Sequence, residues 1–530
     1  MARDGLTRRE IMRYGGATVV GTAGLTLAGI GGYAWPHPAQ ASTATGQAGA
    51  ATGQAGAATA PTSPDRSGGV LHFVTRPDLT PPAITVSHHS RPAGDDPPYF
   101  ILSPAGYPLT GPGQPGLMIL DRYGNLVWFS PNTGFPAAKG MARVDLQAQT
   151  YRGQPVLTWW EGQVGLGVGY GKAVIADTSY RTIATISGGN GLSADLHEFI
   201  ISPQDTALIT AVRRRPANLS ALGGPANGTA LTGSVLEIDI ASGQVLFEWN
   251  SLDWVPVTDT YAAFSGGTEK APFDYFHINS IAVGHDGNLV ISARNTCAVY
   301  KIARSGGEVL WRLGGKRSSF QMGPGAAFWF QHHARPRGTT SLSLFDDGAS
   351  PQKEPQSRAI LLDLDTSAMR ATLTRSYTHP AKLLAANQGS MQLLADGRAL
   401  VGWGNLPYFT EFAENGTLML DGQFPIGDQS YRVFTAGWTG HPTDKPAVAA
   451  RVNQAGGSVV YASWNGATEL SSWTVLAGST ATSLDKAGSQ RRTAFETMIT
   501  VNSAGPYFAV TANDANGHVL GQSGTVRLES

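Results

Sequence analysis

The sequence predicts an all-β protein, a six-bladed β-propeller followed by a C-terminal immunoglobulin- or fibronectin-like β-sandwich. Three observations lead to this prediction. Helical periodicity is almost absent after residue 70, and short β-branched and aromatic runs alternate with turns such as Tyr123-Gly124-Asn125. One polar residue also recurs at the same place in a repeating strand pattern, which is typical of blades arranged about an axis.

The recurring polar residue is a histidine in three of the repeats. His197, His277 and His332 are each followed, about nine to eleven residues later, by an apolar strand, at residues 207–210, 288–291 and 341–344. A fourth copy places Gln388 in the histidine position, ahead of apolar residues 399–402. A repeat that presents one polar residue per unit can bring these residues together about a common axis, so the pattern indicates one shared site.

The remaining strands complete the predicted blades. Hairpins built from an apolar run, a turn and a second apolar run with Trp or Phe recur at residues 117–129, 235–249 and 298–312. Counting the strands that begin with a polar residue, including weaker ones near Pro98 and Met141, gives about six blades. Since the innermost strand of each blade lines the central channel, residues at its start face the channel mouth. We therefore expect a propeller over residues 70–430.

The pattern changes after Tyr431. Alternating strands follow at close spacing, at residues 446–452, 459–464, 473–477 and 507–512, and residues 526–528 complete the set. A segment of this kind reads as an immunoglobulin-like sandwich without the cysteine pair. Residues 431–530 are therefore expected to form an accessory domain with a packing or binding role.

The N-terminus reads as a targeting segment. Thr7-Arg8-Arg9-Glu10-Ile11 matches a twin-arginine signal, and Ala39-Gln40-Ala41 is a candidate cleavage site after a weakly apolar run. Residues 1–41 are thus expected to direct export, either as a cleaved signal or as a membrane anchor at the outer face. Residues 42–69, in which Thr-Gly-Gln-Ala-Gly-Ala-Ala occurs twice, read as a disordered Ala-, Gly- and Thr-rich linker.

Composition excludes several classes of function. The formal net charge is zero and no basic stretch occurs, which argues against a nucleic-acid partner. Cys297 is the only cysteine, so the chain can form neither an internal disulfide nor a cysteine-rich zinc site. No Gly-x-Gly-x-x-Gly strand–helix unit or Walker loop is present, so a nucleotide-type cofactor has no support. Nothing in the sequence specifies an oligomeric state.

The residues around the three histidines favour anion chemistry. Asn279, Arg294, His333 and Arg335 lie close to them in sequence, whereas acidic residues are few. Such a pocket would be electropositive and suited to an oxyanion such as sulfate or carboxylate. A neutral imidazole there could also attack an electrophile, because neighbouring cations would lower its pKa. Two other interpretations remain: polar residues that only tie strand ends together, and a three-histidine metal site, against which the scarcity of carboxylate partners argues.

Together these segments resemble the arylsulfotransferase-like family, in the branch that uses no nucleotide sulfate donor. The resemblance covers about residues 73–424. Its blocks are Phe73-Val74-Thr75-Arg76-Pro77, Asp195-Leu196-His197-Glu198-Phe199, His277-Ile278-Asn279-Ser280, Ser292-Ala293-Arg294-Asn295, Gln331-His332-His333-Ala334-Arg335, and Gly389-Ser390-Met391-Gln392 leading to Val401-Gly402-Trp403-Gly404. Their order and spacing together carry the resemblance.

The resemblance implies a six-bladed propeller that transfers a sulfuryl group from an aryl sulfate to a phenol, without a cofactor, through a sulfohistidine. It assigns His332 as the nucleophile. His197, His277 and Arg294 would bind the sulfuryl oxygens or assist the leaving phenolate. Substrate binding would involve Asn279, His333, Arg335 and Gln388.

The sequence departs from the family pattern in two places. The family usually has Asp directly after the nucleophilic histidine, and here that residue is His333, which leaves open which of His332 and His333 faces the channel. Extra chain between Pro203 and Ser234 is expected to form a loop that shapes the acceptor site.

Two other functions compete with sulfuryl transfer. One is a non-catalytic propeller that binds a small anion or a partner at the channel mouth. The other is a metal-dependent propeller hydrolase such as a lactonase, which the scarcity of acidic residues near the histidines disfavours.

Overall fold

The computed structural model describes residues 66–90, 96–105, 111–135, 139–453 and 457–529, and these are almost entirely β-strand and turn. The all-β prediction is confirmed. The short 3-10 turns in the described residues are η1 (Ser67–Gly69), η3 (Ser220–Leu222), η4 (Ser251–Asp253) and η5 (Val257–Asp259). The expected signal, and the linker up to residue 65, lie outside the described residues. Within the part of the chain described, no helix is long and apolar enough to cross a membrane.

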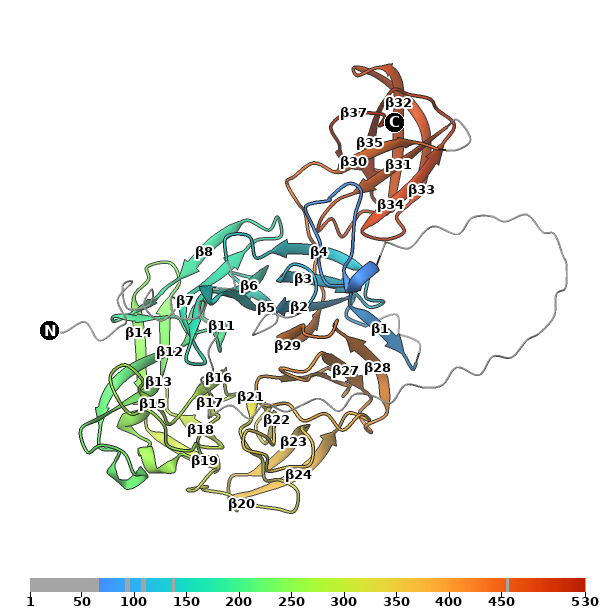
Figure 1. Cartoon of the computed structure of the whole chain (residues 1–530). Helices are drawn as coiled ribbons and strands as arrows, with labels where there is room; N and C mark the ends of the chain where they lie inside the picture. The colour runs from blue at the N-terminus through green and yellow to red at the C-terminus, as the bar shows by residue number, and fades with distance from the viewer. Residues whose placement is uncertain (1–65, 91–95, 106–110, 136–138, 454–456, 530) are drawn as a thin grey trace, which may run out of the picture.

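Six antiparallel sheets, here called sheets 1 to 6, follow one another around a common centre (Figure 1). Sheet 1 has the order β29 (Gln429–Ala436), β2 (Tyr99–Ala105), β3 (Gly116–Asp121) and β4 (Leu126–Pro131). Sheet 2 has the order β5 (Met141–Tyr151), β6 (Gln154–Gly165), β7 (Val168–Ala176) and β8 (Thr182–Ile186). The small pair β9 (Gly188–Gly189) and β10 (Leu192–Ser193) connects it to sheet 3.

Sheet 3 has the order β11 (Phe199–Ile201), β12 (Thr206–Ala217), β13 (Gly228–Asp239) and β14 (Val245–Asn250), with β15 (Phe273–Asp274) parallel to β13. Sheet 4 has the order β16 (Ile278–Val283), β17 (Leu289–Ala293), β18 (Ala298–Ile302) and β19 (Val309–Gly314). Sheet 5 has the order β21 (His332–Arg337), β22 (Ser341–Asp346), β23 (Arg358–Asp365) and β24 (Arg370–Tyr377), with β20 (Gln321–Met322) parallel to β24. Sheet 6 has the order β25 (Ser390–Leu393), β26 (Ala399–Gly402), β27 (Tyr408–Phe412), β28 (Leu418–Gln423) and β1 (Thr85–His88).

The two ends of the ring are joined in sheet 1, where β29, from the end of the ring's sequence, lies beside β2, from its beginning. β29 pairs with β2 from Tyr99↔Ala436 to Ala105↔Gln429, and Figure 1 shows the orange β29 beside the blue β2. The strand near Pro98 is therefore second in its sheet, not innermost as expected. The predicted boundary between residues 430 and 431 is also wrong, because it falls inside β29, whose backbone hydrogen bonds tie it to the ring.

The apolar residues of the ring lie between neighbouring sheets. The cluster that includes Ile209 and Trp160 joins sheets 2 and 3, and the cluster that includes Trp249 and Tyr300 joins sheets 3 and 4. Similar buried clusters join each of the other neighbouring pairs, including sheets 6 and 1. Because every sheet is covered on both faces, its strands are apolar on both sides, and polar residues are left mainly for the strand ends.

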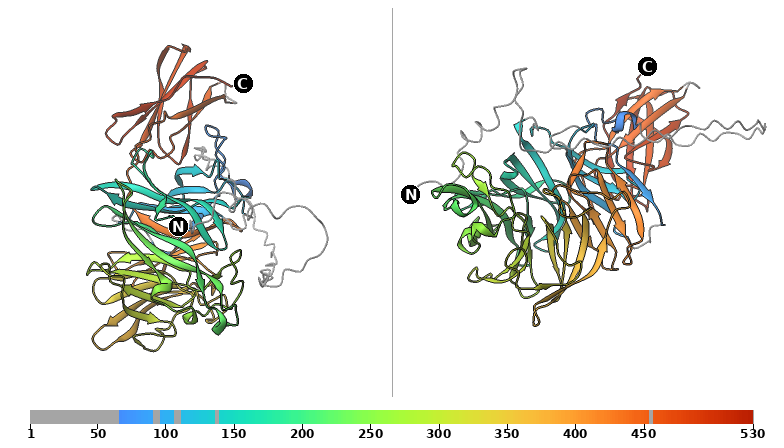
Figure 2. Two further views of the ribbon diagram at one scale, coloured as in Figure 1. Left: turned by 90° about the vertical axis from the view of Figure 1, so that its left-hand side faces the viewer. Right: turned by 60° about the horizontal axis from the view of Figure 1, so that its bottom comes forward.

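The C-terminal residues form two further sheets that face each other. The first has the order β30 (Ala447–Val452), β31 (Ser458–Ser463) and β34 (Glu496–Val501). The second has the order β33 (Ser483–Arg491), β32 (Ser472–Thr480), β35 (Tyr507–Asn513) and β36 (Val519–Gln522), with β37 (Val526–Arg527) on β35. Their inner faces enclose a core that contains Trp473 and Phe508. This C-terminal domain projects from one side of the ring in both views of Figure 2.

The C-terminal domain is attached to the ring by polar contacts as well as by the chain. The Glu496 carboxylate accepts hydrogen bonds from the backbone N–H groups of Val74 and Thr75, at 3.1 and 2.6 Å. The Asn465 amide both accepts from and donates to the backbone of Phe129, at 2.9 Å in each case. These contacts lie away from the histidines and do not supply residues to the site.

Candidate active site

The three histidines lie where the first strands of sheets 3, 4 and 5 begin. His197 and His277 come shortly before β11 and β16, and His332 is the first residue of β21. His277 has a left-handed backbone, with φ of 52°, next to a register shift in the β16–β17 ladder. Such a bulge redirects a side chain out of the strand alternation. The rings of His197 and His277 meet edge to face, with centroids 4.9 Å apart.

Each of these histidines is bonded through Nδ1 to a carboxylate. The partner of His197 is Asp195 at 2.6 Å, that of His277 is Asp274 at 2.5 Å, and that of His332 is Asp347 at 2.7 Å. The expectation that carboxylate partners would be few is therefore wrong. Two of the carboxylates lie just before their histidine in sequence. Asp347 is brought in by the antiparallel β21–β22 hairpin, because it follows β22 directly and β22 ends beside the start of β21.

The hydrogen bonds of His332 determine which of its nitrogens carries the proton. Nε2 lies 3.3 Å from the backbone N–H of Gln388, which can only donate, so Nε2 is the unprotonated atom and Nδ1–H donates to Asp347. Burial lowers the pKa of His332 well below its usual range, and nearby Arg294, His277 and His197 lower it further. Burial raises the pKa of Asp347, which Arg294 partly opposes. His332 is therefore a neutral imidazole with its lone pair on Nε2.

Arg294 follows the last residue of β17 and is held beside His277. Its backbone N–H donates to the carbonyl of His277 at 2.9 Å. The guanidinium donates to Asn295 Oδ1 at 3.0 Å and to the carbonyl of Ala386 at 3.1 Å, and it lies over the Phe330 ring at 4.9 Å. These contacts fix a permanent positive charge close to His332.

His333 points away from the three histidines. Its Nδ1 accepts a hydrogen bond from the backbone N–H of Met391 at 3.3 Å, and its ring packs against Phe434. Burial, together with Arg335, lowers the pKa of His333 well below its usual range. The left-handed backbone of His333, with φ of 54°, separates the directions of the two neighbouring side chains. Of the pair, His332 is the one that faces Arg294 and the other histidines.

The side chains of Asn279 and Arg335 also make hydrogen bonds to other residues near the starts of the inner strands. The Asn279 amide donates to the carbonyl of Gln331 at 2.7 Å, and Arg335 donates to Glu198 at 2.6 Å. Asn279 Oδ1 and His333 Nε2 have no hydrogen-bond partner among the described residues, so the expectation that Asn279, His333 and Arg335 bind substrate stays a prediction. Gln388 lies beside His332, because its backbone N–H reaches His332 Nε2, and its side-chain Oε1 also has no hydrogen-bond partner among the described residues.

The sequence profile of the arylsulfotransferase (ASST) family matches residues 147–425, which is more than half of the chain and contains all three histidines and Arg294. The chain belongs to this family. The recognised resemblance is thereby confirmed, and the family indicates a sulfotransferase acting on aryl sulfates and phenols.

Curated proteins and solved structures give no further indication of function. No curated protein matches the sequence. Among solved structures, a protein of unknown function from Bacteroides caccae is similar at 14% identity over 63% of this chain and 98% of its own, with a TM-score of 0.38. An inactive variant of virginiamycin B lyase from Staphylococcus aureus, crystallised with quinupristin, is similar at 11% identity over 65% of this chain and 89% of its own, with a TM-score of 0.32. Similarities this weak support no inference about function.

One residue of the arylsulfotransferase site region was not identified from the sequence. Arg432, on β29, is buried at the centre of the inner strands, where it pairs with Asp145 at 3.1 Å and Glu198 at 2.8 Å. It also donates to the carbonyls of His197 and Asn279, at 2.8 and 2.9 Å. Burial lowers the pKa of Arg432, but Asp145 and Glu198 raise it more. Arg432 therefore holds the strands that present the histidines.

Sheets 2 and 3 extend past the histidines at the mouth of the site. Gly169 on β7 donates its N–H to Asp195 at 2.6 Å, and a side-chain carbon at Gly167 would lie 3.5 Å from Cε1 of His277. The extra chain between Pro203 and Ser234 is not the expected loop. Most of it lengthens β12 and β13, which stay paired from Thr206↔Asp239 to Ala217↔Gly228. The mouth is therefore bordered by two long hairpins.

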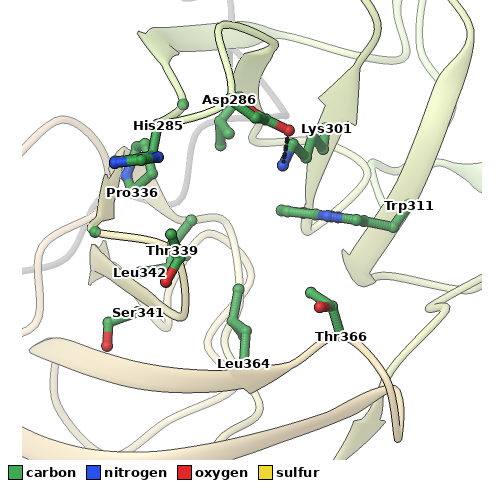
Figure 3. A pocket seen from close by; sticks show the side chains of 13 residues that line it. His285, Asp286, Lys301, Trp311, Pro336, Thr339, Ser341, Leu342, Leu364 and Thr366 are labelled. Carbon is green, nitrogen blue, oxygen red and sulfur yellow. Dashed lines mark ion pairs between the residues drawn. The ribbon is translucent and has the colours of Figure 1, made fainter.

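A separate cavity of about 230 Å³ lies between sheets 4 and 5, at the strand ends opposite the histidines (Figure 3). Trp311 forms one side of it, and the Lys301–Asp286 ion pair, 2.6 Å long, lies at its rim. In the chain as described, no group of three or more His, Cys, Asp or Glu side chains is arranged to hold a metal ion.

Proposed function

We propose that this protein is an exported, nucleotide-independent arylsulfotransferase that moves a sulfuryl group from an aryl sulfate ester to a phenol through a sulfohistidine at His332. The observation that carries the proposal is the unprotonated Nε2 of His332, held by Asp347 and surrounded by Arg294, His277 and His197. Sulfuryl transfer needs such a neutral nucleophile beside fixed positive donors.

In the first half-reaction, Nε2 of His332 attacks sulfur while the bond between sulfur and the aryl oxygen breaks. The electron pair of that bond leaves with the phenolate. The imidazole gains positive charge, which its Nδ1–H···Asp347 hydrogen bond stabilises. Arg294 balances charge on the sulfuryl oxygens, and His197 or His277 gives a proton to the leaving oxygen and recovers it from the acceptor phenol in the second half-reaction.

The second half-reaction is the reverse with a new phenol. The phenol oxygen loses its proton to the same pair of histidines and attacks sulfur, and the bond between sulfur and Nε2 breaks. Asp195 and Asp274 hold the two rings so that their Nε2 atoms face the substrate. As written, the reaction uses only side chains of this chain and no cofactor.

The fold and the N-terminus fit this proposal. We interpret the six sheets as the six blades of a propeller, and the C-terminal domain as an immunoglobulin-like sandwich with an accessory role. The twin-arginine pattern in residues 1–41 would export the chain, leaving it outside the cell or anchored at the outer face of the membrane.

The direct test is release of 4-nitrophenol from 4-nitrophenyl sulfate, with and without phenol, by the wild type, His332→Asn and the control His285→Asn. His285 lies exposed in a turn at the opposite strand ends. We expect phenol-dependent release that is lost only in His332→Asn, and a sulfuryl adduct on His332 by mass spectrometry. If folded wild type releases no nitrophenol with several donors and acceptors but still binds sulfate, the non-catalytic binding function is correct instead.

A further inference from the structure

Three consecutive arginines lie on the part of β12 that extends past the histidines, and they differ in how they are paired. Arg213 forms an ion pair with Glu248 at 3.0 Å, and Arg215 forms one with Asp253 at 2.5 Å. Arg214 points to the other face of the strand, where its nearest carboxylate is Glu269 at 3.5 Å. Since the Glu269 side chain is 73% exposed, this contact is a weak one.

The weak contact with Glu269 does not compensate for the cost of burying the Arg214 guanidinium. Its side chain is only 12% exposed, and its Nε and Nη2 atoms are buried without a hydrogen-bond partner among the described residues. A buried guanidinium with unmatched N–H groups is costly unless something else accepts its hydrogen bonds. An anionic ligand would supply that acceptor, in the bidentate geometry that guanidinium groups favour.

The register of sheet 3 places Arg214 beside the histidine cluster. Arg214 pairs with Leu231 in the β12–β13 ladder, and Leu231 pairs with Asp274 in the β13–β15 ladder. Because residues paired across strands project to the same face of a sheet, Arg214 and Asp274 share a face. Asp274 is bonded to His277, so the backbone of Arg214 lies about two strand spacings, roughly 10 Å, from the backbone of a residue that holds the histidine cluster.

Tyr170 lies on the other side of the same mouth. It follows Gly169, whose backbone N–H donates to Asp195. Burial raises the pKa of Tyr170 to about 12, while Arg214 acts to lower it and Asp195 and Asp274 raise it. The phenol hydroxyl therefore lies near enough to Arg214, Asp195 and Asp274 for their charges to act on it.

We propose that Arg214 and Tyr170 form a subsite for an anionic group, a carboxylate, on the aryl ring of the substrate. This inference rests on the proposed sulfuryl transfer. Because the departing and attacking aryl oxygens occupy the same position opposite His332 Nε2, one subsite serves both donor and acceptor. The preferred substrates are then phenols whose carboxylate is separated from the reacting hydroxyl by the ring.

The test compares acceptors that differ only in charge. The full-length protein is given 4-nitrophenyl sulfate as donor, with 4-hydroxyphenylacetate or its neutral amide as acceptor, and with phenol as reference. We expect the wild type to favour the acid over the amide by about tenfold in kcat/KM, as a charge-assisted hydrogen bond allows. Arg214→Gln brings the ratio close to one. Tyr170→Phe lowers it less, by about threefold, because the hydroxyl is an uncharged donor and contributes a single hydrogen bond.

The matched control is Arg213→Gln, one residue away and paired with Glu248 outside the mouth. It should keep the wild-type preference. An unchanged ratio in Arg214→Gln, or equal losses in the two variants, would overturn the subsite while leaving sulfuryl transfer to phenol intact. Failure of the wild type to transfer to any acceptor would overturn both proposals. Calorimetric titration of wild type and Arg214→Gln with 4-hydroxyphenylacetate gives an independent check, and equal affinity would also refute the subsite.

Discussion

Two clusters of charged and polar residues lie on the inner strands, and they differ in how completely their charges are matched. In the Arg432 cluster, consisting of Arg432, Arg335, Asp145 and Glu198, each guanidinium meets a carboxylate within 3.1 Å. In the histidine cluster, consisting of His197, His277, His332 and Arg294 with their partners, the carboxylates are used on Nδ1. The Nε2 lone pair of His332 then has only a 3.3 Å backbone contact.

Hydrogen bonding, and not residue type, distinguishes the Arg432 cluster, which supports the fold, from the histidine cluster, which carries the chemistry. Both clusters are buried and both contain arginine and carboxylates. The matched cluster resists change, because removing one member leaves opposite charges unpaired. The histidine cluster leaves a nucleophilic atom and nearby positive charge available to a substrate. Substitutions in the first should therefore change stability, and substitutions in the second should change rate.

The largest effect is expected on stability, from Arg432→Met. Removing this guanidinium leaves Asp145 and Glu198 buried together, and the free energy of unfolding should fall by about 3–5 kcal/mol. Urea unfolding measures this. The control Arg181→Met breaks an exposed ion pair with Asp177, worth about 0–1 kcal/mol. Equal stability of the two variants would contradict the supporting role of Arg432.

The next effect is expected on rate, from Arg294→Gln. Loss of its fixed charge should lower kcat/KM for 4-nitrophenyl sulfate by about 10²–10³-fold, as for removal of a preorganised donor to a developing negative charge. The melting temperature should change little. Arg317→Gln, which removes an exposed arginine from its ion pair with the buried Asp259, is the control and should keep its rate. A fall in stability that accounts for the lost rate would place Arg294 with the structural cluster.

A smaller loss is expected from Asp347→Asn. An asparagine amide can donate to Nδ1 of His332, which would move the proton to Nε2 and remove the lone pair, so sulfuryl-enzyme formation should slow by about 10²-fold. Single-turnover release of 4-nitrophenol measures the rate, and the nitrogen-15 shifts of the His332 ring report the tautomer. A slower rate with an unchanged tautomer would show that Asp347 acts only by packing.

The part of the site that depends on local pattern can be predicted from the sequence. A histidine at the start of one strand and Arg294 at the end of the next lie together because a tight hairpin returns the chain to its starting level. The same rule could have found Asp347, which occupies in sheet 5 the position that Arg294 occupies in sheet 4. Asp347 is less apparent than Asp195 and Asp274 because it lies 15 residues from its histidine in sequence.

Other features depend on pairing that the sequence does not display. Arg432 reaches the site because β29 pairs with β2, from the opposite end of the ring, and no local periodicity reports that closure. Arg214 lies at the mouth because β12 and β13 continue past the length of their neighbours, through Gly- and Pro-containing chain that reads as a loop. Left-handed backbone at His277 and His333 likewise arises from ladder bulges and not from residue type.

The smallest change is expected on moving the pH, which tests the protection of His332 in the histidine cluster without a substitution. The reactive form of His332 is the unprotonated one, and burial with nearby positive charge lowers its pKa below the usual range. The rate of sulfuryl-enzyme formation should therefore stay level as the pH falls through about 6.5, where an ordinary histidine gains its proton. It should decline only in more acidic solution. Single-turnover rates from pH 8 to pH 5 in one buffer series test this, with circular dichroism to follow folding. A rate that halves near the ordinary histidine pKa, in protein that stays folded and in the His197→Gln and His277→Gln variants as well, would mean that His332 is exposed to solvent protons.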